Sequence, residues 1–121
     1  MSAPGAFSWN SELPSGRNPF WIRDDALAEI GLHAGDAVSV DTSAEPRNGD
    51  LVVAEVELDG DSHRVARRYF LHSGSVRLES VGESAASFDL PRDSVMVMGV
   101  IVSRLRFSAG GGEPIEEPLA P

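Results

Sequence analysis

The stretch Gly35–Ala54, with the sequence GDAVSVDTSAEPRNGDLVVA, carries the most informative pattern in the chain. In its first half, Val38 and Val40 alternate with small or polar residues, which is the two-residue period of a strand with one buried face. In its second half, Leu51–Ala54 is an unbroken apolar run, which is typical of a strand covered on both faces. Asn48-Gly49 favours a turn because both residues tolerate a positive φ angle. The stretch therefore predicts two strands joined by a tight, polar connection.

Similar patterns recur on both sides of this stretch and predict a mostly β fold with one short helix. The strand pattern of Leu51–Ala54 is expected to continue through Glu55–Leu58. Further strands are expected at Phe20–Arg23, His63–Leu71, Val76–Glu79, Phe88–Leu90 and Val95–Phe107. Gly99 in the last of these strands is expected to mark a bend or a bulge. The short helix is expected at Ala26–Ile30, after two aspartates that offer a cap and before Gly31, which suits a left-handed C-terminal position.

The composition changes at both ends of this patterned region. Residues 1–19 are rich in Ser, Pro, Gly and Asn and are expected to form an N-terminal arm. Residues 20–107 are expected to be the folded domain. Residues 108–121 are rich in Gly, Pro and Glu and are expected to be a disordered acidic tail. A length of 121 residues suits a single hydrophobic core.

The charge balance restricts the kinds of partner. The net charge is -9 and the pI is about 4.6, so direct binding to nucleic acid is not expected. The absence of cysteine, of a long apolar run and of a basic leader segment predicts a cytoplasmic protein without a membrane contact. All 10 basic residues are arginine, so the chain has no lysine amine that could act as a base.

Two charged clusters are candidates for a site. Asp24 and Asp25 could be paired carboxylates for a metal or for acid–base work, although such a pair before a helix is more often a cap. Arg64, Arg67 and Arg68 form the basic cluster of the chain. They suit a carboxylate or a phosphate, although pairing with neighbouring acids is the more common arrangement.

Histidines and nearby serines offer weaker candidates. The residues concerned are His33, His63, His72, Ser62, Ser73 and Ser75. A Ser–His pair could support nucleophilic catalysis, but serines beside turns are more often structural. The histidines lack the spacing of metal ligands, so no metal site and no cofactor are expected.

The order of motifs in Gly35–Ala54 resembles the central signature of the LexA-like serine peptidase family, which includes the self-cleaving SOS repressors and the UmuD mutagenesis protein. The matching pieces are Gly35-Asp36, Val38–Asp41, Pro46-Arg47, Gly49-Asp50 and Leu51–Ala54. Flanking matches at Gly31-Leu32, Val76–Glu79 and Gly99–Arg106 extend the resemblance over about Phe20–Phe107. The resemblance implies the complex β fold shared by LexA and signal peptidase.

In that family a serine is activated by a neutral, buried lysine. Counting back from Gly35-Asp36 places the serine position at Ala26 and the glycine of its motif at Asp24, and the lysine strand matches at Arg67. Alanine has no oxygen that could attack a carbonyl, and arginine keeps its proton. The resemblance therefore implies a peptidase fold without its catalytic dyad, and the protein is expected not to be an enzyme.

The resemblance also implies which binding functions such a domain retains after the loss of catalysis. It implies homodimerisation, or pairing with a related LexA-like protein, and a cleft that accepts an extended peptide segment. The cleft candidates are Asp24, Asp25, Ala26, Leu27, Arg67 and Arg68. The favoured hypothesis is a pseudo-peptidase that acts as a dimerisation and protein-binding module in regulation, in a stress response or in a DNA-damage response. The alternatives are a UmuD-like accessory factor to a polymerase or repressor, and a hydrolase with relocated catalytic residues.

Overall fold

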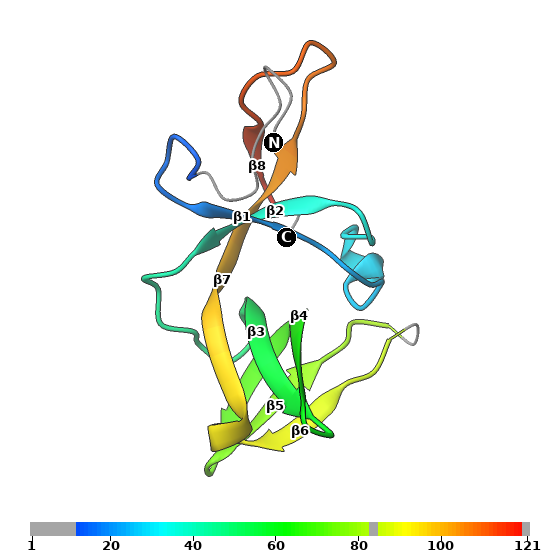
Figure 1. Ribbon diagram of the computed structural model, residues 1–121, viewed down its shortest axis with the longest axis vertical. Helices are drawn as coiled ribbons and strands as arrows, with labels where there is room; N and C mark the ends of the chain where they lie inside the picture. Colours follow the sequence, from blue (N-terminus) through cyan, green and yellow to red (C-terminus); the bar gives the residue numbers. More distant parts are fainter. Residues whose placement is uncertain (1–11, 83–84, 120–121) are drawn as a thin grey trace.

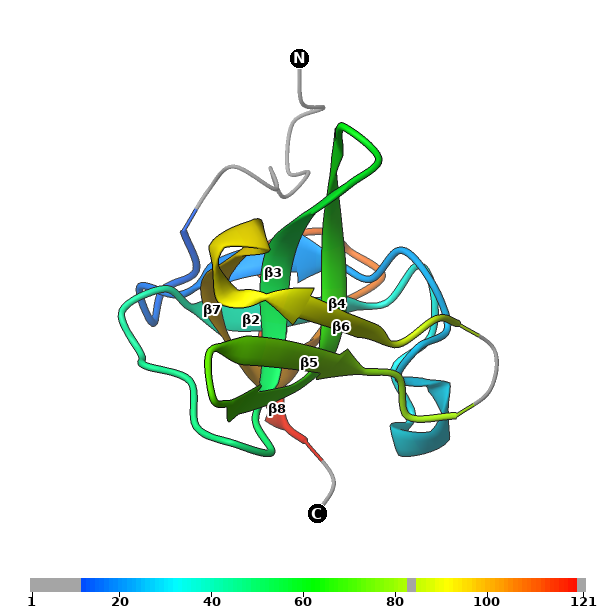
Figure 2. The same ribbon diagram turned by 90° about the horizontal axis from the view of Figure 1, so that it is seen from below.

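The computed structural model describes residues 12–82 and 85–119. Its elements are β1 (Asn18–Trp21), η1 (Ala28–Ile30), β2 (Ala37–Asp41), β3 (Leu51–Leu58), β4 (Asp61–His72), β5 (Ser75–Glu79), β6 (Phe88–Pro91), η2 (Arg92–Ser94), β7 (Val95–Arg106) and β8 (Ile115–Pro118), where η denotes a 3-10 helix. One antiparallel sheet has the order β1-β2-β7-β3-β4-β5-β6, and β8 also pairs with β7. The predicted mostly β fold is confirmed. β7 links the β1–β2 end of the molecule to the β3–β6 end (Figure 1), and β5 and β6 cross the β3–β4 hairpin (Figure 2).

The two strands predicted in Gly35–Ala54 are present, but they are not neighbours. β7 lies between β2 and β3 and pairs with both of them. The connection over 42–50 is polar, as expected: the Arg47 backbone N–H donates to the Asp50 carboxylate at 2.8 Å, and Gly49 has a φ of 96°. The prediction of a tight connection is corrected, because the chain has to pass across β7 between the two strands.

The unbroken apolar run of β3 separates two parts of the hydrophobic core. Val53 packs into a cluster with Leu27 on one face, whereas Val52 and Ala54 pack into a cluster with Leu78 on the other. None of these three β3 side chains is more than 2% exposed. The predicted cover on both faces of this strand is confirmed.

β2 differs from its predicted one-sided pattern, because its polar position is also buried. The Ser39 hydroxyl shares a hydrogen bond with the Ser103 hydroxyl of β7, which also donates to the Glu116 carboxylate of β8 at 3.1 Å. The tail predicted to be disordered supplies this cover: β8 pairs with β7 from Ser103 to Arg106. The disorder prediction is therefore corrected for Ile115–Pro118, whose composition masked a strand that a long-range partner stabilises.

Glu116 gives the packing of β8 a pH dependence. Burial raises the pKa of Glu116, but hydrogen bonds from Ser15, Ser39, Ser103 and Arg17 outweigh it and hold the pKa below its usual 4.5. The ionised group therefore stabilises the fold above pH 4.5, and this contribution is lost as the pH falls through the lowered folded-state pKa.

We expect Glu116→Gln to lower the free energy of unfolding by about 1 kcal/mol at pH 7. The difference from the wild type should shrink below pH 4.5, where the wild-type carboxylate also becomes neutral. Urea unfolding at a series of pH values measures both effects. Glu117→Gln is the matched control, because Glu117 pairs with Arg106 in a more exposed position and should contribute less than about 0.5 kcal/mol. A pH-independent difference between wild type and Glu116→Gln would contradict this explanation.

Gly99 lies beside the irregularity that the sequence predicted. In the pairing of β3 with β7, Val53 is opposite Gly99 whereas Ala54 is opposite Val97, so Met98 is the extra residue of a bulge. The predicted bulge is confirmed. A Cβ atom on Gly99 would lie 2.5 Å from Val40 Cγ1 and 2.7 Å from the carbonyl oxygen of Asp41, so the glycine allows β2 to cross closely here.

We therefore expect Gly99→Ala to reduce the free energy of unfolding by about 1 to 3 kcal/mol, the usual cost of overpacking a well-filled interior. Chemical denaturation measures the loss. Gly110→Ala is the control, because a Cβ at Gly110 meets no atom within 4 Å. Equal stability of the two variants would mean that the contact with β2 does not require glycine.

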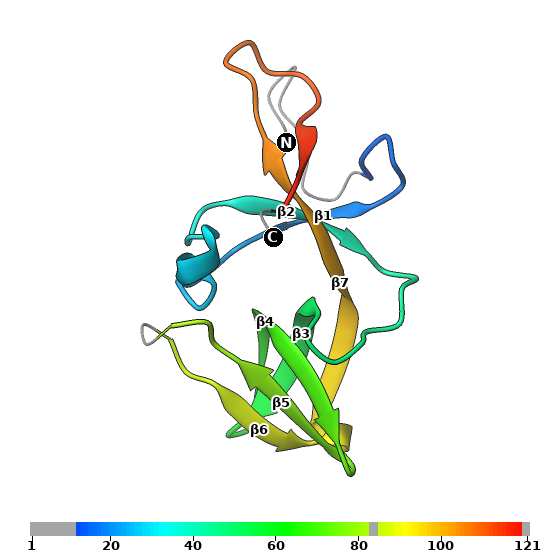
Figure 3. The ribbon, with the colours of Figure 1, turned by 180° about the vertical axis from the view of Figure 1, so that it is seen from behind.

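The predicted helix at Ala26–Ile30 is shorter in the structure. Only Ala28–Ile30 is helical, as a 3-10 turn, and Gly31 closes it with a φ of 89°, as predicted. Its N-cap residue is Leu27 and no side chain caps it, so the expected capping by Asp24 and Asp25 is corrected. The segment lies beside the start of the loop that follows β5 (Figures 1 and 3), where the Val81 N–H donates to the Ala26 carbonyl.

Candidate functional site

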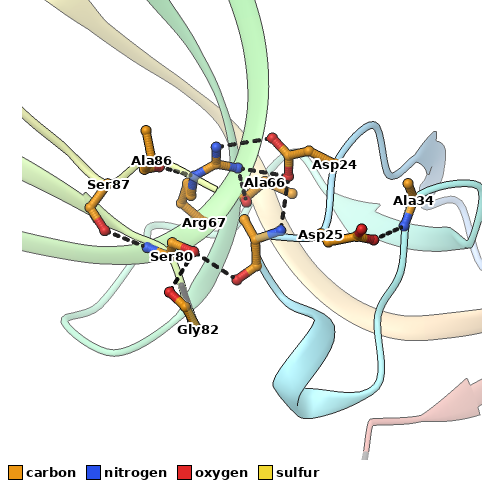
Figure 4. A network of polar contacts seen from close by, with 10 residues as sticks. Asp24, Asp25, Ala34, Ala66, Arg67, Ser80, Gly82, Ala86 and Ser87 are labelled. Carbon is orange, nitrogen blue, oxygen red and sulfur yellow. Dashed lines mark hydrogen bonds and ion pairs between the residues drawn. The ribbon is translucent and has the colours of Figure 1, made fainter. Parts of the chain in front are cut away.

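Arg67 of β4 and Asp24 form a partly buried ion pair at the centre of the candidate site (Figure 4). The pair is bidentate: Arg67 Nη1 donates to Asp24 Oδ1 at 3.1 Å, and Nη2 donates to Oδ2 at 3.0 Å. The Arg67 side chain is 2% exposed, whereas that of Asp24 is 40% exposed. Water therefore reaches the carboxylate but not the guanidinium.

Further contacts fix the Arg67 guanidinium in place. Its Nε donates to the Ala86 carbonyl at 3.0 Å, and its Nη1 also donates to the Ala66 carbonyl at 2.9 Å (Figure 4). The Cζ atom of the group lies over the Phe88 ring, 5.3 Å from the ring centroid. The charged group is thus held by three oxygen-bearing groups and by an aromatic face.

Ala26 is joined to Arg67 through the Asp24 carboxylate. The Ala26 backbone N–H donates to Asp24 Oδ1 at 3.1 Å, the same oxygen that accepts from Arg67. The Ala26 carbonyl accepts from the Val81 N–H at 2.6 Å and from the Ser80 hydroxyl at 3.2 Å. These contacts hold the segment before η1 against Ser80 and Val81, which follow β5, and the Ala26 methyl group is fully buried.

Five of the six predicted cleft residues fall into a buried group and an exposed group. Ala26, Leu27 and Arg67 are buried, so their side chains do not line an open surface. Leu27 belongs to the hydrophobic core. Asp24 remains half-exposed, and Asp25 is exposed and accepts the Ala34 N–H at 3.0 Å across the loop.

Arg68 is separated from the Arg67–Asp24 ion pair by the alternation of β4. Successive side chains of a strand point to opposite faces, so Arg68 does not join its neighbour. Arg68 is half-buried, and its Nε atom has no hydrogen-bond partner among the residues described. The predicted basic cluster of Arg64, Arg67 and Arg68 is therefore not one site.

The weaker candidates are not brought together within the described part of the chain. His33, His63 and His72 are exposed, and no hydrogen bond between a serine and a histidine occurs within residues 12–82 and 85–119. No three His, Asp or Glu side chains of these ranges are grouped so that they could hold a metal ion. No helix in the described ranges is long and apolar enough to cross a membrane.

The structure also has a pocket that the sequence did not predict, and two of its lining residues are close in sequence to Asp24 and Arg67. It has a volume of about 570 Å³ and is lined by residues of β1, β2, β3, β4 and β7, including Phe20, Val53 and Met98. Arg23, which precedes Asp24, and Arg64, which precedes Arg67 by three positions, also line it. Arg64 belongs to the predicted basic cluster, but the other residues that line the pocket come from distant parts of the chain.

A protein-family model, described as Peptidase S24-like, matches residues 4–102. The chain belongs to this family. The match covers the ion pair, the pocket and the strands around them. The family is the one that the motif order in Gly35–Ala54 resembles, so that recognition is confirmed.

Curated relatives of this S24-like chain are LexA repressors. Over 88 residues it is 33% identical to the LexA repressor of Shewanella piezotolerans, a match that covers 70% of this chain and 40% of that protein. It is 29% identical over 85 residues to the LexA repressor of Limosilactobacillus fermentum, with 38% of that protein covered, and 30% identical over 85 residues to that of Cereibacter sphaeroides, with 36% covered. The chain thus matches about two fifths of the length of these relatives.

Proposed function

We propose that this S24-like domain is inactive as a peptidase and acts as a dimerisation and protein-binding module. The observation that supports the loss of catalysis most directly is the bidentate Arg67–Asp24 pair. The motif spacing predicts the family's general base at the position of Arg67, and a base has to be able to lose its proton. A guanidinium that is held by a carboxylate and two carbonyl oxygens cannot do this.

The nucleophile position supports the same proposal. Ala26 offers only a methyl group, and its backbone is tied to Asp24, Ser80 and Val81. A relocated hydrolase would need another nucleophile near a base, and the described residues show no serine bonded to a histidine. Treatment with a fluorophosphonate probe tests this part of the proposal: we expect no covalent labelling, and labelling of any serine would favour the hydrolase alternative.

Two strand edges support a binding role. β4 pairs with β3 from Asp61 to Arg68 and with β5 from Arg68 to His72, so no described strand covers its other edge from Asp61 to Arg67. β7 pairs with β3 but with no other described strand from Val95 to Val97. Edges of this kind can accept an extended segment by hydrogen bonding to the backbone.

We propose that β7 provides the dimer contact through its first half. Its second half is flanked by β2 and β8, whereas Met96 in the first half is 63% exposed. We expect a dimer by size-exclusion chromatography with light scattering, and a shift to monomer for Met96→Asp. Ile115→Asp is the control, because Ile115 is 50% exposed on β8 and should leave the dimer intact. A wild-type protein that stays monomeric at high concentration would contradict the dimer proposal.

The biological setting of the module is proposed by family analogy alone. The relatives are named LexA repressors, and a regulatory role in a stress or DNA-damage response follows that analogy. In the UmuD-like alternative, the domain assists a polymerase or repressor. Affinity capture with purified candidate proteins separates the two: binding to a LexA-like protein supports the first, and binding to a polymerase supports the second.

A further inference from the structure

The pocket beside β1 has an unusual charge for this chain. The chain contains 19 acidic and 10 basic residues, yet the lining of the pocket includes two arginines, Arg23 and Arg64, and no aspartate or glutamate. The rest of the lining is mainly apolar, with Phe20, Val53 and Met98 among its members. This acidic protein thus has a pocket with a mainly apolar lining and two positively charged residues.

The two pocket arginines also lack the acidic partners that five of the other eight arginines have within the described residues. Ion pairs to acidic side chains are formed by Arg17, Arg67, Arg77, Arg104 and Arg106. Arg23 and Arg64 form no ion pair and no side-chain hydrogen bond to any residue within 12–82 or 85–119. Arg64 is opposite Glu55 in the β3–β4 pairing, but no ion pair joins them. Both guanidinium groups are therefore available to an external acceptor.

From this arrangement we infer that the pocket selects extended peptides that carry an acidic side chain next to an apolar one. The inference rests on the proposed protein-binding function and names the chemistry of its ligand. Arg64 lies on the part of β4 whose outer edge has no described strand partner, so a peptide added along this edge passes the pocket. Its apolar side chain would fill the hollow, and its carboxylate would accept hydrogen bonds from the arginines.

The net charge of the chain argues for a short acidic peptide rather than a polyanion. A net charge of -9 repels a nucleic-acid backbone. One carboxylate placed between two arginines gains local charge-assisted hydrogen bonds, and the long-range repulsion is screened over a Debye length of about 8 Å at physiological ionic strength. Arg23 and Arg64 thereby become the specificity-determining residues of this pocket, whose lining does not include Arg67.

The test uses a phage-displayed library of random octapeptides, selected on the immobilised full chain. We expect the selected peptides to be enriched in Asp or Glu beside an apolar residue. A synthetic peptide of the selected sequence should bind about five- to tenfold more tightly than its Glu→Gln or Asp→Asn analogue, as one charge-assisted contact at a partly exposed site provides. Fluorescence anisotropy measures both affinities.

The double variant Arg23→Gln/Arg64→Gln should bind both peptides equally, while Arg47→Gln, a change at an exposed arginine outside the pocket, should keep the wild-type ratio. Thermal melting checks that all three proteins are folded. Selected peptides without acidic enrichment, or an acidic preference that survives in the double variant, would overturn the inference and leave the binding function standing. A selection that yields no binding peptide would overturn both.

Discussion

Replacement of Asp24 by alanine is expected to lower the free energy of unfolding by about 2 to 3 kcal/mol, far more than the loss of a surface ion pair. The reason is the unequal exposure of the partners. Arg67 is 2% exposed and would remain buried with an unpaired charge. The Ala26 N–H would lose its acceptor as well. Urea unfolding of Asp24→Ala at neutral pH measures the effect.

Replacement of Arg67, the other partner, should lower the free energy of unfolding by a smaller amount. In Arg67→Met, the half-exposed Asp24 carboxylate can be hydrated, and an apolar side chain can pack against Phe88, so we expect a loss of only about 1 kcal/mol. The double variant Asp24→Ala/Arg67→Met should then be more stable than Asp24→Ala alone, because the second change removes the unpaired, buried charge of Arg67. Single losses that simply add in the double variant would show that the two side chains are not coupled.

The second large effect concerns reactivity. If Ala26 and Arg67 stand at the positions of the family's serine and lysine, the pair Ala26→Ser/Arg67→Lys should still be inert. Asp24 would lie beside the introduced lysine and hold it in the charged form. The triple variant Asp24→Gly/Ala26→Ser/Arg67→Lys leaves a buried amine without a counter-charge, which favours the neutral base. We expect it to react with a fluorophosphonate probe about a hundredfold faster than the double variant.

A matched control separates the position of the lysine from its mere presence. Asp24→Gly/Ala26→Ser/Arg68→Lys has the same composition as the triple variant, but the lysine lies on the opposite face of β4. It should react no faster than the double variant. The labelled serine is identified by mass spectrometry. Equal labelling of the control and the triple variant would refute the assignment of Arg67 to the base position.

Much of the fold was predictable because its signals are local. The apolar run Leu51–Ala54, the closing glycine at Gly31 and the bulge beside Gly99 all follow from backbone preferences and alternation within a few residues. The motif order around Gly35–Ala54 predicted the family. The strand Ile115–Pro118 was missed because its Gly- and Pro-rich surroundings resemble a disordered tail, and pairing with β7 overrides that composition.

The candidate site was predictable only in part. Motif spacing and the family resemblance named Asp24, Ala26 and Arg67, but the resemblance implied an open cleft rather than an ion pair with a buried guanidinium. The pocket was missed because its lining combines β1, β2, β3, β4 and β7, and no sequence pattern specifies which side chains of separate strands converge.

The sequence by itself determined that this protein has no lysine amine, because composition does not depend on folding. It also determined the strands and turns whose causes are local. Only the tertiary structure placed β7 between β2 and β3, joined Asp24 to Arg67 across 43 positions, and left Arg23 and Arg64 without acidic partners among the described residues. These features depend on contacts between distant segments. Such contacts stabilise the protein only when the whole sheet has formed.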